Sequence, residues 1–464
     1  MRRFELVLAF VAVFAIGWPV VFGVRPRRGI VAGLLAAAVV VQLYVEGFRW
    51  QMIPLYMAAV ALAAGDVFFL DRTMEWPTRI VRGLLGVIGL AFASALPLVL
   101  PVPEIPPPSG PEHIGTYSVM LTDRSRDELY GPRPGGPREF MVQVWYPAQE
   151  TDEQAEPLPW SEDWEVVAPA ISSNLGFPSW FLDQTGYTLS HARPNLAPAP
   201  GAFPLVIFSH DWQGTRTGTL NQIEQLVSNG YVVIAPDHTY VAAATVLAEG
   251  EVIHDDPAAL PDPGNTDETT YQEASTQLVA TLTGDLVSIL AELEEGETGE
   301  LSAIAPTVDL NRIGIYGYGA GGGAAIATCL EHERCSAVLG TDPWVEPLTE
   351  RELRIDMTKP ALYMRSDEWV DTANDALLLG IAGRGTTVTY MIGIEGASHN
   401  DFTMMSLISP IAPQLGLTGP IGADRVIPIV DNYVLGFFDV YLLGTGSAAL
   451  DSIAFPEVTV NVIE

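Results

Sequence analysis

The sequence predicts an α/β protein, with a mostly parallel sheet and helices on both faces, preceded by about four membrane-spanning helices. Two observations predict this class. From residue 203 onward, apolar runs of strand length alternate with helical patterns, which is the order of a parallel sheet covered by helices. Before residue 103, four longer apolar stretches follow one another with short connections. The chain therefore divides into an apolar N-terminal part and a large globular part.

The four apolar stretches cover residues 6–22, 29–45, 52–70 and 83–102. Each is near the length needed to cross about 30 Å of hydrocarbon. The first has Arg2 and Arg3 at its start like a signal peptide, but no clear small-residue cleavage site follows. Asp66 and Gln42 lie inside stretches, where we expect polar groups that face the other helices. We predict a multi-pass cell-membrane segment.

The distribution of arginines gives an orientation. Six arginines fall in the first and third connections and three on the other side. Under the positive-inside rule this favours cytoplasmic first and third loops, and an extracytoplasmic C-terminal domain.

Charge separates the two parts. Residues 1–103 hold nine arginines and five acidic residues, a net charge of +4. The remaining chain holds 14 basic and 51 acidic residues, a net charge of −37. A domain this acidic repels nucleic acid and anionic headgroups, so we expect no nucleic-acid partner.

A proline-rich linker, residues 104–115, precedes the globular domain of residues 116–464. Residues 117–122 and 140–146 predict two strands of an edge hairpin. Residues 149–202 are rich in acids, prolines and tryptophans without sustained periodicity, which favours a covering segment or lid. The later elements are expected as strands at 203–210, 231–236, 336–340, 361–364 and 387–392, helices at 219–228, 270–293 and 426–443, and a solvated acidic loop at 291–300.

Residues 312–325, RIGIYGYGAGGGAA, predict a buried strand that enters a sharp glycine-rich turn and then a helix. This is the pattern of the nucleophile elbow G-x-S-x-G of α/β-hydrolases, and the position of its Ser is here Gly319. The same letters fit a dinucleotide-binding fingerprint through Gly317, Gly319 and Gly322, with Asp342 about 20 residues further on. Glycines that only let the helix approach the strand are a third interpretation.

The order of later residues favours the hydrolase interpretation. In α/β-hydrolases the nucleophile is followed by an acid and then by a histidine. Gly319 is followed by Asp342 after the next strand, and by His399 in the segment GASHNDF after the last. A dinucleotide fingerprint should also form the first strand-to-helix turn of its unit, whereas two strands precede this one.

At this point the sequence resembles the plasma-type platelet-activating factor acetylhydrolases and their bacterial relatives. The resemblance covers most of residues 115–460 and is carried by the segments WYP at 145–147, FPLVIFSH at 203–210, GYVVIAPDH at 230–238, DLNRIGIYG at 309–317, DPW at 342–344 and GASH at 396–399. It implies an α/β-hydrolase fold and a serine carboxylesterase that acts on short or oxidised acyl chains of phospholipids, without a metal or other cofactor.

By position, the resemblance implies that Asp342 is the triad acid and His399 the triad base. It implies that the oxyanion amides come from Trp212 and Ala320. Further residues expected to line the pocket are His210, Asp211, Tyr318, His238 and Trp344.

Two departures from the family pattern lie at the catalytic centre. The family's Ser-His-Gly reads Ser209-His210-Asp211 here, and the elbow Ser is Gly319. Without the hydroxyl no acyl-enzyme forms, and a carboxylate at 211 would set negative charge near a developing oxyanion. We therefore predict a catalytically degenerate, membrane-anchored esterase relative that binds a lipid-like ester or serves a protein partner. Restoring the hydroxyl with Gly319→Ser is expected to restore activity if the scaffold is otherwise intact.

Beside the weaker interpretation as a dinucleotide binder through Gly317, Gly319 and Gly322, two alternatives remain open. One is a working esterase in which a water activated by the His399 and Asp342 pair attacks the ester directly. The other treats the four helices as the functional part and the acidic domain as their scaffold.

Cys329 and Cys335 either close a small disulfide or remain buried thiols. The histidines show no metal-ligand spacing, so no metal is expected.

Overall fold

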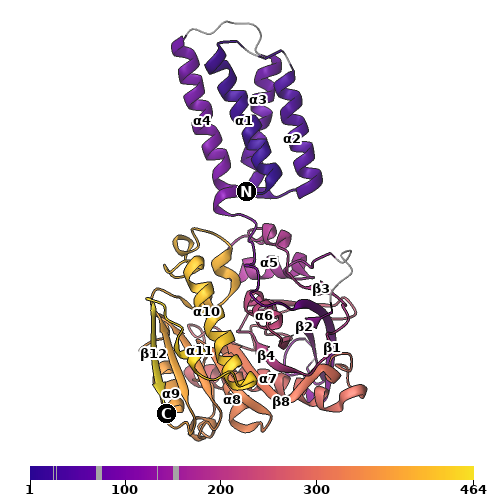
Figure 1. Cartoon of the computed structure of the whole chain (residues 1–464), viewed down its shortest axis with the longest axis vertical. Coiled ribbons are helices and arrows are strands. Elements are labelled where there is room, and N and C mark those ends of the chain that lie inside the picture. The colour runs from indigo at the N-terminus through magenta and orange to yellow at the C-terminus, as the bar shows by residue number, and fades with distance from the viewer. Residues whose placement is uncertain (25, 28, 69–75, 133, 150–155) are drawn as a thin grey trace. The chain divides into compact units, whose positions relative to one another are not determined.

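The computed structural model describes residues 1–464 except residues 25, 28, 69–75, 133 and 150–155 (Figure 1). The chain forms two compact units. The first contains Met1–Pro103 with the short segments Asp183–Thr185 and Ile408–Ile411, and the second contains the rest.

The first unit is built from four helices, α1 (Arg3–Phe22), α2 (Ile30–Glu46), α3 (Ile53–Phe68) and α4 (Trp76–Val99). Small and aliphatic side chains such as Leu8, Leu35 and Ala59 pack between them, while many large apolar side chains are exposed. An all-round apolar surface of this kind is typical of helices that face lipid.

Three of the four expected spans are long and apolar enough to cross a membrane: α1, α4, and α3 together with the 3-10 turn before it (Trp50–Phe68, 19 residues). Helix α2, with 17 residues, is a shorter apolar helix. Two further helices of this length and composition, α7 (Glu268–Glu295) and α10 (Ala423–Phe438, continued to Leu443), belong to the second unit and are half buried there. Gln42 faces the bundle as expected, since it is fully buried and accepts a hydrogen bond from the Tyr56 hydroxyl at 2.6 Å.

The second unit is organised around a ten-stranded sheet in the order β12-β11-β10-β9-β8-β4-β5-β2-β1-β3. The strands from β11 to β5 are parallel, whereas β12 and β2 run antiparallel to their neighbours. The strands are β1 (His113–Asp127), β2 (Pro137–Ala148), β3 (Arg193–Pro194), β4 (Phe203–Ser209), β5 (Val232–Asp237), β8 (Val308–Tyr318), β9 (Cys335–Thr341), β10 (Ala361–Ser366), β11 (Thr389–Ile394) and β12 (Val458–Ile463). A separate hairpin joins β6 (Ala244–Val246) and β7 (Val252–His254).

Helices cover both faces of the sheet. Helix α7 packs against α8 (Ala320–Glu331), and α6 (Leu220–Ser228) packs against α10. Along β8, Ile313 and Ile315 join the core that contains α7 and α8, whereas the Tyr316 hydroxyl bonds to Gln222 of α6. Successive strand residues point to opposite faces, so the two helix pairs lie on opposite sides. The predicted α/β architecture is confirmed.

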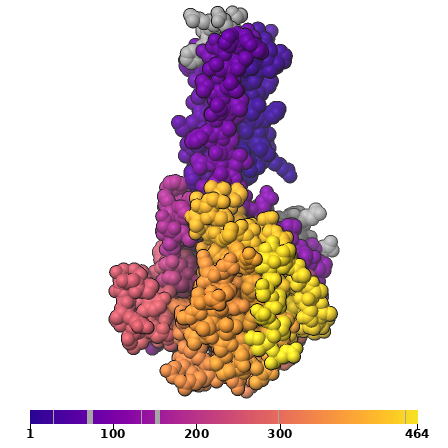
Figure 2. Space-filling model, turned by 90° about the vertical axis from the view of Figure 1, so that its left-hand side faces the viewer, coloured from indigo at the N-terminus to yellow at the C-terminus, as the bar shows by residue number. Residues whose placement is uncertain are grey.

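Several elements differ from the sequence prediction. The expected solvated loop at 291–300 is wrong in its first half, because α7 continues to Glu295 before a short 3-10 turn. The edge strand β12 was not predicted; the C-terminal residues, yellow in Figure 2, lie on the outside of this unit. Within 149–202, residues 150–155 lie outside the described part, and the remainder includes α5 (Trp164–Asn174). Among the described residues, the α-helices not yet named are α9 (Ala373–Ala382) and α11 (Ala448–Asp451).

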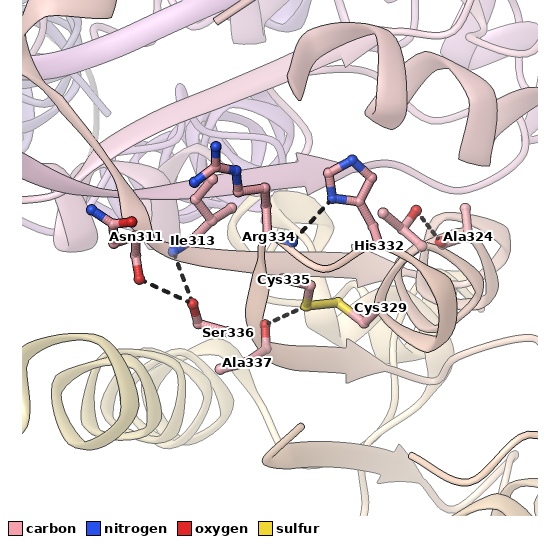
Figure 3. Close-up of a disulfide and its surroundings, with 10 residues drawn as sticks. Asn311, Ile313, Ala324, Cys329, His332, Arg334, Cys335, Ser336 and Ala337 are labelled. Carbon is pink, nitrogen blue, oxygen red and sulfur yellow. Dashed lines mark hydrogen bonds between the residues drawn. A yellow bond between two sulfur atoms is a disulfide. The ribbon is translucent and has the colours of Figure 1, made fainter. Parts of the chain in front are cut away.

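The question left open for the two cysteines is answered by the geometry. Cys329 near the end of α8 and Cys335 at the start of β9 form a disulfide (Figure 3). The bridge ties the helix that follows the elbow to the next strand of the sheet. Both sulfurs are buried.

Candidate active site

The elbow forms where the sequence predicts it. Strand β8 ends at Tyr318, α8 begins at Ala320, and Gly319 between them has φ 58° and ψ −121°. The Gly319 amide donates to the carbonyl of Thr341, and its carbonyl accepts from the Trp344 amide at 2.8 Å. This turn points residue 319 toward the carboxyl end of the sheet, the position at which an elbow presents its side chain.

The other glycines of the elbow are required by close packing. A Cβ at Gly317 would overlap the backbone of Gly321, and a Cβ at Gly321 would overlap the carbonyl of Ser209. A Cβ at Gly322 would lie 2.7 Å from the Cα of Pro343. These contacts support the interpretation that the glycines let helix and strand approach each other, and they account for the motif without a bound dinucleotide.

Asp342 and His399 come together as the motif order predicts. Asp342 follows β9 with φ 42° and is fully buried. One carboxylate oxygen accepts from the Ser366 amide at 2.8 Å, and the other accepts from the Ser366 hydroxyl and lies 3.0 Å from His399 Nδ1. The acid therefore orients the imidazole and leaves Nε2 to face the elbow.

The Nε2 atom of His399 meets a carboxylate. Asp211, in the loop after β4, places Oδ2 3.0 Å from His399 Nε2, and its Oδ1 accepts from the Ala320 amide at 2.6 Å. A Cβ built on Gly319 would overlap the carboxyl carbon of Asp211. The Asp211 side chain thus fills the place of an elbow hydroxyl. It also accepts the hydrogen bond of the amide that is expected to bind an oxyanion. The expectation that Gly319→Ser alone restores activity is therefore revised, since its side chain has no room while Asp211 stays in place.

Two aromatic rings enclose the imidazole. Trp369 stacks on His399 with ring centroids 4.7 Å apart and an interplanar angle of 6°. The ring of Tyr318 also stacks on His399, with ring centroids 4.5 Å apart. Burial by itself would lower the pKa of His399, but the hydrogen bonds and negative charges of Asp211 and Asp342 outweigh it and raise the pKa to about 10. His399 is therefore an imidazolium at neutral pH, and aromatic faces favour a cation.

The loop of residues 209–214, here called the Asp211 loop, is held at its base by buried histidines. His210 Nδ1 bonds to the Asp211 carbonyl at 2.7 Å, and His210 Nε2 accepts from the His238 amide at 3.1 Å. Burial lowers the pKa of His210 to about 4, so its ring is neutral and can serve as donor and acceptor at once. The sequence predicts that His210 and His238 line the pocket. Neither lines an open pocket, because both side chains are almost fully buried.

A chain of polar contacts continues from this loop into the interior. The Ser209 hydroxyl lies 2.9 Å from His238 Nε2, and His238 Nδ1 lies 2.9 Å from Asp285 of α7. Asp285 also pairs with Arg138 at 2.8 Å. All four side chains are buried, so this Ser-His-Asp series braces the Asp211 loop and is closed to solvent.

The remaining expected residues lie around this centre. Trp212 follows Asp211 and packs, half-buried, against the main core, and its role as an oxyanion donor stays a prediction. Trp344 contributes its backbone amide to Gly319, while its ring nitrogen donates to Glu346. Sequence reasoning missed Ser366, Trp369 and Glu368, which accepts a bond from the His399 amide at 3.0 Å. Ser366 ends β10 and the other two follow it closely, and this position at the carboxyl end of a parallel strand was the available signal.

Comparison with known proteins decides the family. The family model described as platelet-activating factor acetylhydrolase, isoform II, matches residues 103–443. This chain belongs to that family. Platelet-activating factor acetylhydrolase of Cavia porcellus is 23% identical over 353 residues, which cover 72% of this chain and 78% of the relative. The protein of the same name from Gallus gallus is 22% identical over 372 residues, covering 73% and 84%.

A solved esterase has the same fold as this acetylhydrolase family member. The ferulic acid esterase from Streptomyces cinnamoneus matches with a TM-score of 0.63 and 26% sequence identity, over 77% of this chain and 99% of the esterase. Family and fold together identify the second unit as an α/β-hydrolase of the acetylhydrolase type. Asp342 and His399 are in hydrogen-bond contact beside the elbow, and Asp211 lies against Gly319; their catalytic roles stay predictions.

Proposed function

We propose that this chain is a membrane-anchored member of the platelet-activating factor acetylhydrolase family that has lost serine-type ester hydrolysis. In this proposal Gly319 replaces the nucleophilic Ser, and the protein binds a lipid-like ester or serves a protein partner without efficient turnover. The four apolar helices of the first unit would anchor it, with the acidic hydrolase domain outside the cytoplasm.

The observation that carries the proposal is the position of the Asp211 carboxylate. An acyl-transfer site needs a nucleophile beside the imidazole and free amides for the oxyanion. Asp211 bonds to the Ala320 amide and to His399 Nε2, so an ester carbonyl would have to displace a charged group from both. Attack by Asp211 itself on an ester would form a tetrahedral intermediate, which expels the carboxylate more readily than the alkoxide and returns to the starting ester instead of giving a mixed anhydride.

The alternative of a water-activating esterase finds less support. A general base needs a free lone pair on Nε2, and an imidazolium has none. The two carboxylates that raise the pKa of His399 to about 10 keep that lone pair protonated at neutral pH. Such an enzyme would reach its full rate only at strongly alkaline pH.

Ester turnover tests the proposal. The full-length protein in detergent and its His399→Ala variant are assayed with p-nitrophenyl acetate between pH 6 and 10. We expect both rates to equal that of heat-inactivated protein. A rate that His399→Ala abolishes would instead support the water-activating esterase. Liposomes containing a short-chain phosphatidylcholine provide a second readout, since a binding protein would retain the lipid unhydrolysed.

A further inference from the structure

The Asp211 carboxylate has the surroundings of a nucleophile. Its Oδ1 accepts the Ala320 amide, its Oδ2 contacts His399 Nε2, and about a fifth of the side chain is open to solvent. An ionised carboxylate offers about four lone-pair sites on its two oxygens, so the two bonds leave others free. Carboxylates form covalent intermediates in enzymes when a carbon with a suitable leaving group is held beside them.

The chemistry of the site selects the substrate class. A carboxylate is a poor nucleophile toward esters, as argued above, but it displaces a leaving group at a saturated carbon to give a stable ester. The proton on His399 Nε2 faces Asp211 Oδ2. An oxygen leaving the attacked carbon departs on the side away from the attacking Asp211 oxygen, and it must come within hydrogen-bond distance of the same Nε2 to take this proton. A strained ring whose oxygen needs that proton on opening is an epoxide.

We propose that Asp211 is a catalytic nucleophile and that the site hydrolyses an epoxide to a diol, with His399 as acid and then base. The inference uses the site of the proposed function but does not depend on the loss of ester hydrolysis.

In the first step a lone pair of Asp211 forms a bond to one epoxide carbon, and the carbon–oxygen bond of the ring breaks. The electron pair goes to the ring oxygen, which takes the Nε2 proton of His399. The products are a hydroxyalkyl ester on Asp211 and a neutral imidazole, which keeps its proton on Nδ1 and still donates it in a hydrogen bond to Asp342.

In the second step the neutral His399 takes a proton from water, and the hydroxide adds to the carboxyl carbon of Asp211. The Ala320 amide stabilises the resulting oxyanion, since it already donates to this carboxylate. The alkoxide leaves with the proton from His399, and the new carboxylic acid of Asp211 returns its own proton to the ring. The sum is epoxide plus water giving diol, with one Asp211 oxygen replaced by water oxygen.

The electrostatics of the site suit both halves of this cycle. While Asp211 is charged, it helps keep His399 protonated and ready to act as acid. Once Asp211 becomes a neutral ester, its charge is lost and only Asp342 still favours the imidazolium. The ring is therefore a better base when the second step requires one.

The test uses the full-length protein in detergent with 1,2-epoxyoctane in water enriched in oxygen-18. We expect 1,2-octanediol, and peptide mass spectrometry should find oxygen-18 in the peptide that contains Asp211. In Asp211→Asn the diol rate should fall at least ~10²-fold, while the matched surface change Glu395→Gln should leave it unaltered.

Failure has a distinct signature. The absence of diol above the Asp211→Asn level, or diol without label in the Asp211 peptide, would overturn the inference. The labelling is measured on the wild-type chain, so it remains decisive if Asp211→Asn does not fold. The p-nitrophenyl acetate assay reports separately on the proposed loss of ester hydrolysis, and either result can fail without the other.

Discussion

The carboxyl carbon of Asp211 occupies the space that a Cβ on Gly319 would need. A side chain at 319 would exclude the carboxylate from this position. The carboxylate comes from the loop of the neighbouring strand β4 and lies where an elbow side chain would point. The imidazole of His399 keeps a partner at Nε2.

This relationship predicts that a serine site needs two substitutions. Gly319→Ser alone should stay inactive, because its side chain meets Asp211. Gly319→Ser combined with Asp211→Gly removes the obstacle and frees the Ala320 amide for an oxyanion. We expect the double variant to exceed the single variant by at least ~10²-fold in p-nitrophenyl acetate turnover, the scale of one oxyanion donor.

Labelling with a fluorophosphonate gives a second readout of the same comparison. The double variant should be labelled and Asp211→Gly alone should not, since only the former has the hydroxyl. Equal activity of the single and double serine variants would show that Asp211 leaves the site easily.

The protonation of His399 gives a pH prediction. Its pKa in the folded protein, about 10, lies above the ordinary value of about 6.5. The stabilisation from its two carboxylate partners is therefore complete below pH 6.5 and is lost as pH rises through 10. The melting temperature of the wild type should fall between pH 7 and 10 by more than that of Asp211→Asn, which keeps one partner. Histidine-selective NMR should also show a lower pKa of His399 in the variant.

The buried network below the Asp211 loop gives a stability prediction. Asp285→Asn removes the charge opposite the buried Arg138 and is expected to cost about 3–5 kcal/mol in the free energy of unfolding. The control Asp309→Asn breaks the partly exposed pair with Arg312 and should cost about 0–1 kcal/mol. Urea unfolding of both variants measures the difference. Similar losses in the two would mean that the buried pair contributes no more than a surface pair.

The disulfide gives a second stability prediction. Cys329 and Cys335 are separated by six positions, and closing a loop of this length stabilises a protein by about 2 kcal/mol in the chain-entropy model. Reduction should lower the urea midpoint of the wild type accordingly. The double variant Cys329→Ala with Cys335→Ala should start from the lower midpoint and show no response to the reductant. A response there would assign the effect to something other than this bridge.

The sequence predicted much of the fold because its signals are local. Alternating apolar strands and helical patterns placed β4, β5, β8, β9, β10 and β11 to within a few residues. Strand β12 was not predicted although its segment VTVNVI alternates β-branched and polar residues, and its place at the edge of the sheet depends on pairing with β11. The continuation of α7 to Glu295 was not predicted, because an acidic run on a helix surface has the same composition as a solvated loop.

For the site, the sequence by itself determined the elbow, the missing hydroxyl at 319, and the order in which acid and histidine follow. These depend on short motifs and on the rule that parallel strands end at one edge of a sheet. Only the tertiary structure decided what fills the space at 319. Asp211 and Ala320 are 109 positions apart, and they meet because Ser209 of β4 is paired with Gly317 of β8. The stacking of Trp369 on His399 likewise depends on how the loops after β10 and β11 pack. Such contacts depend on side-chain packing between distant segments, which the pattern of one segment does not encode.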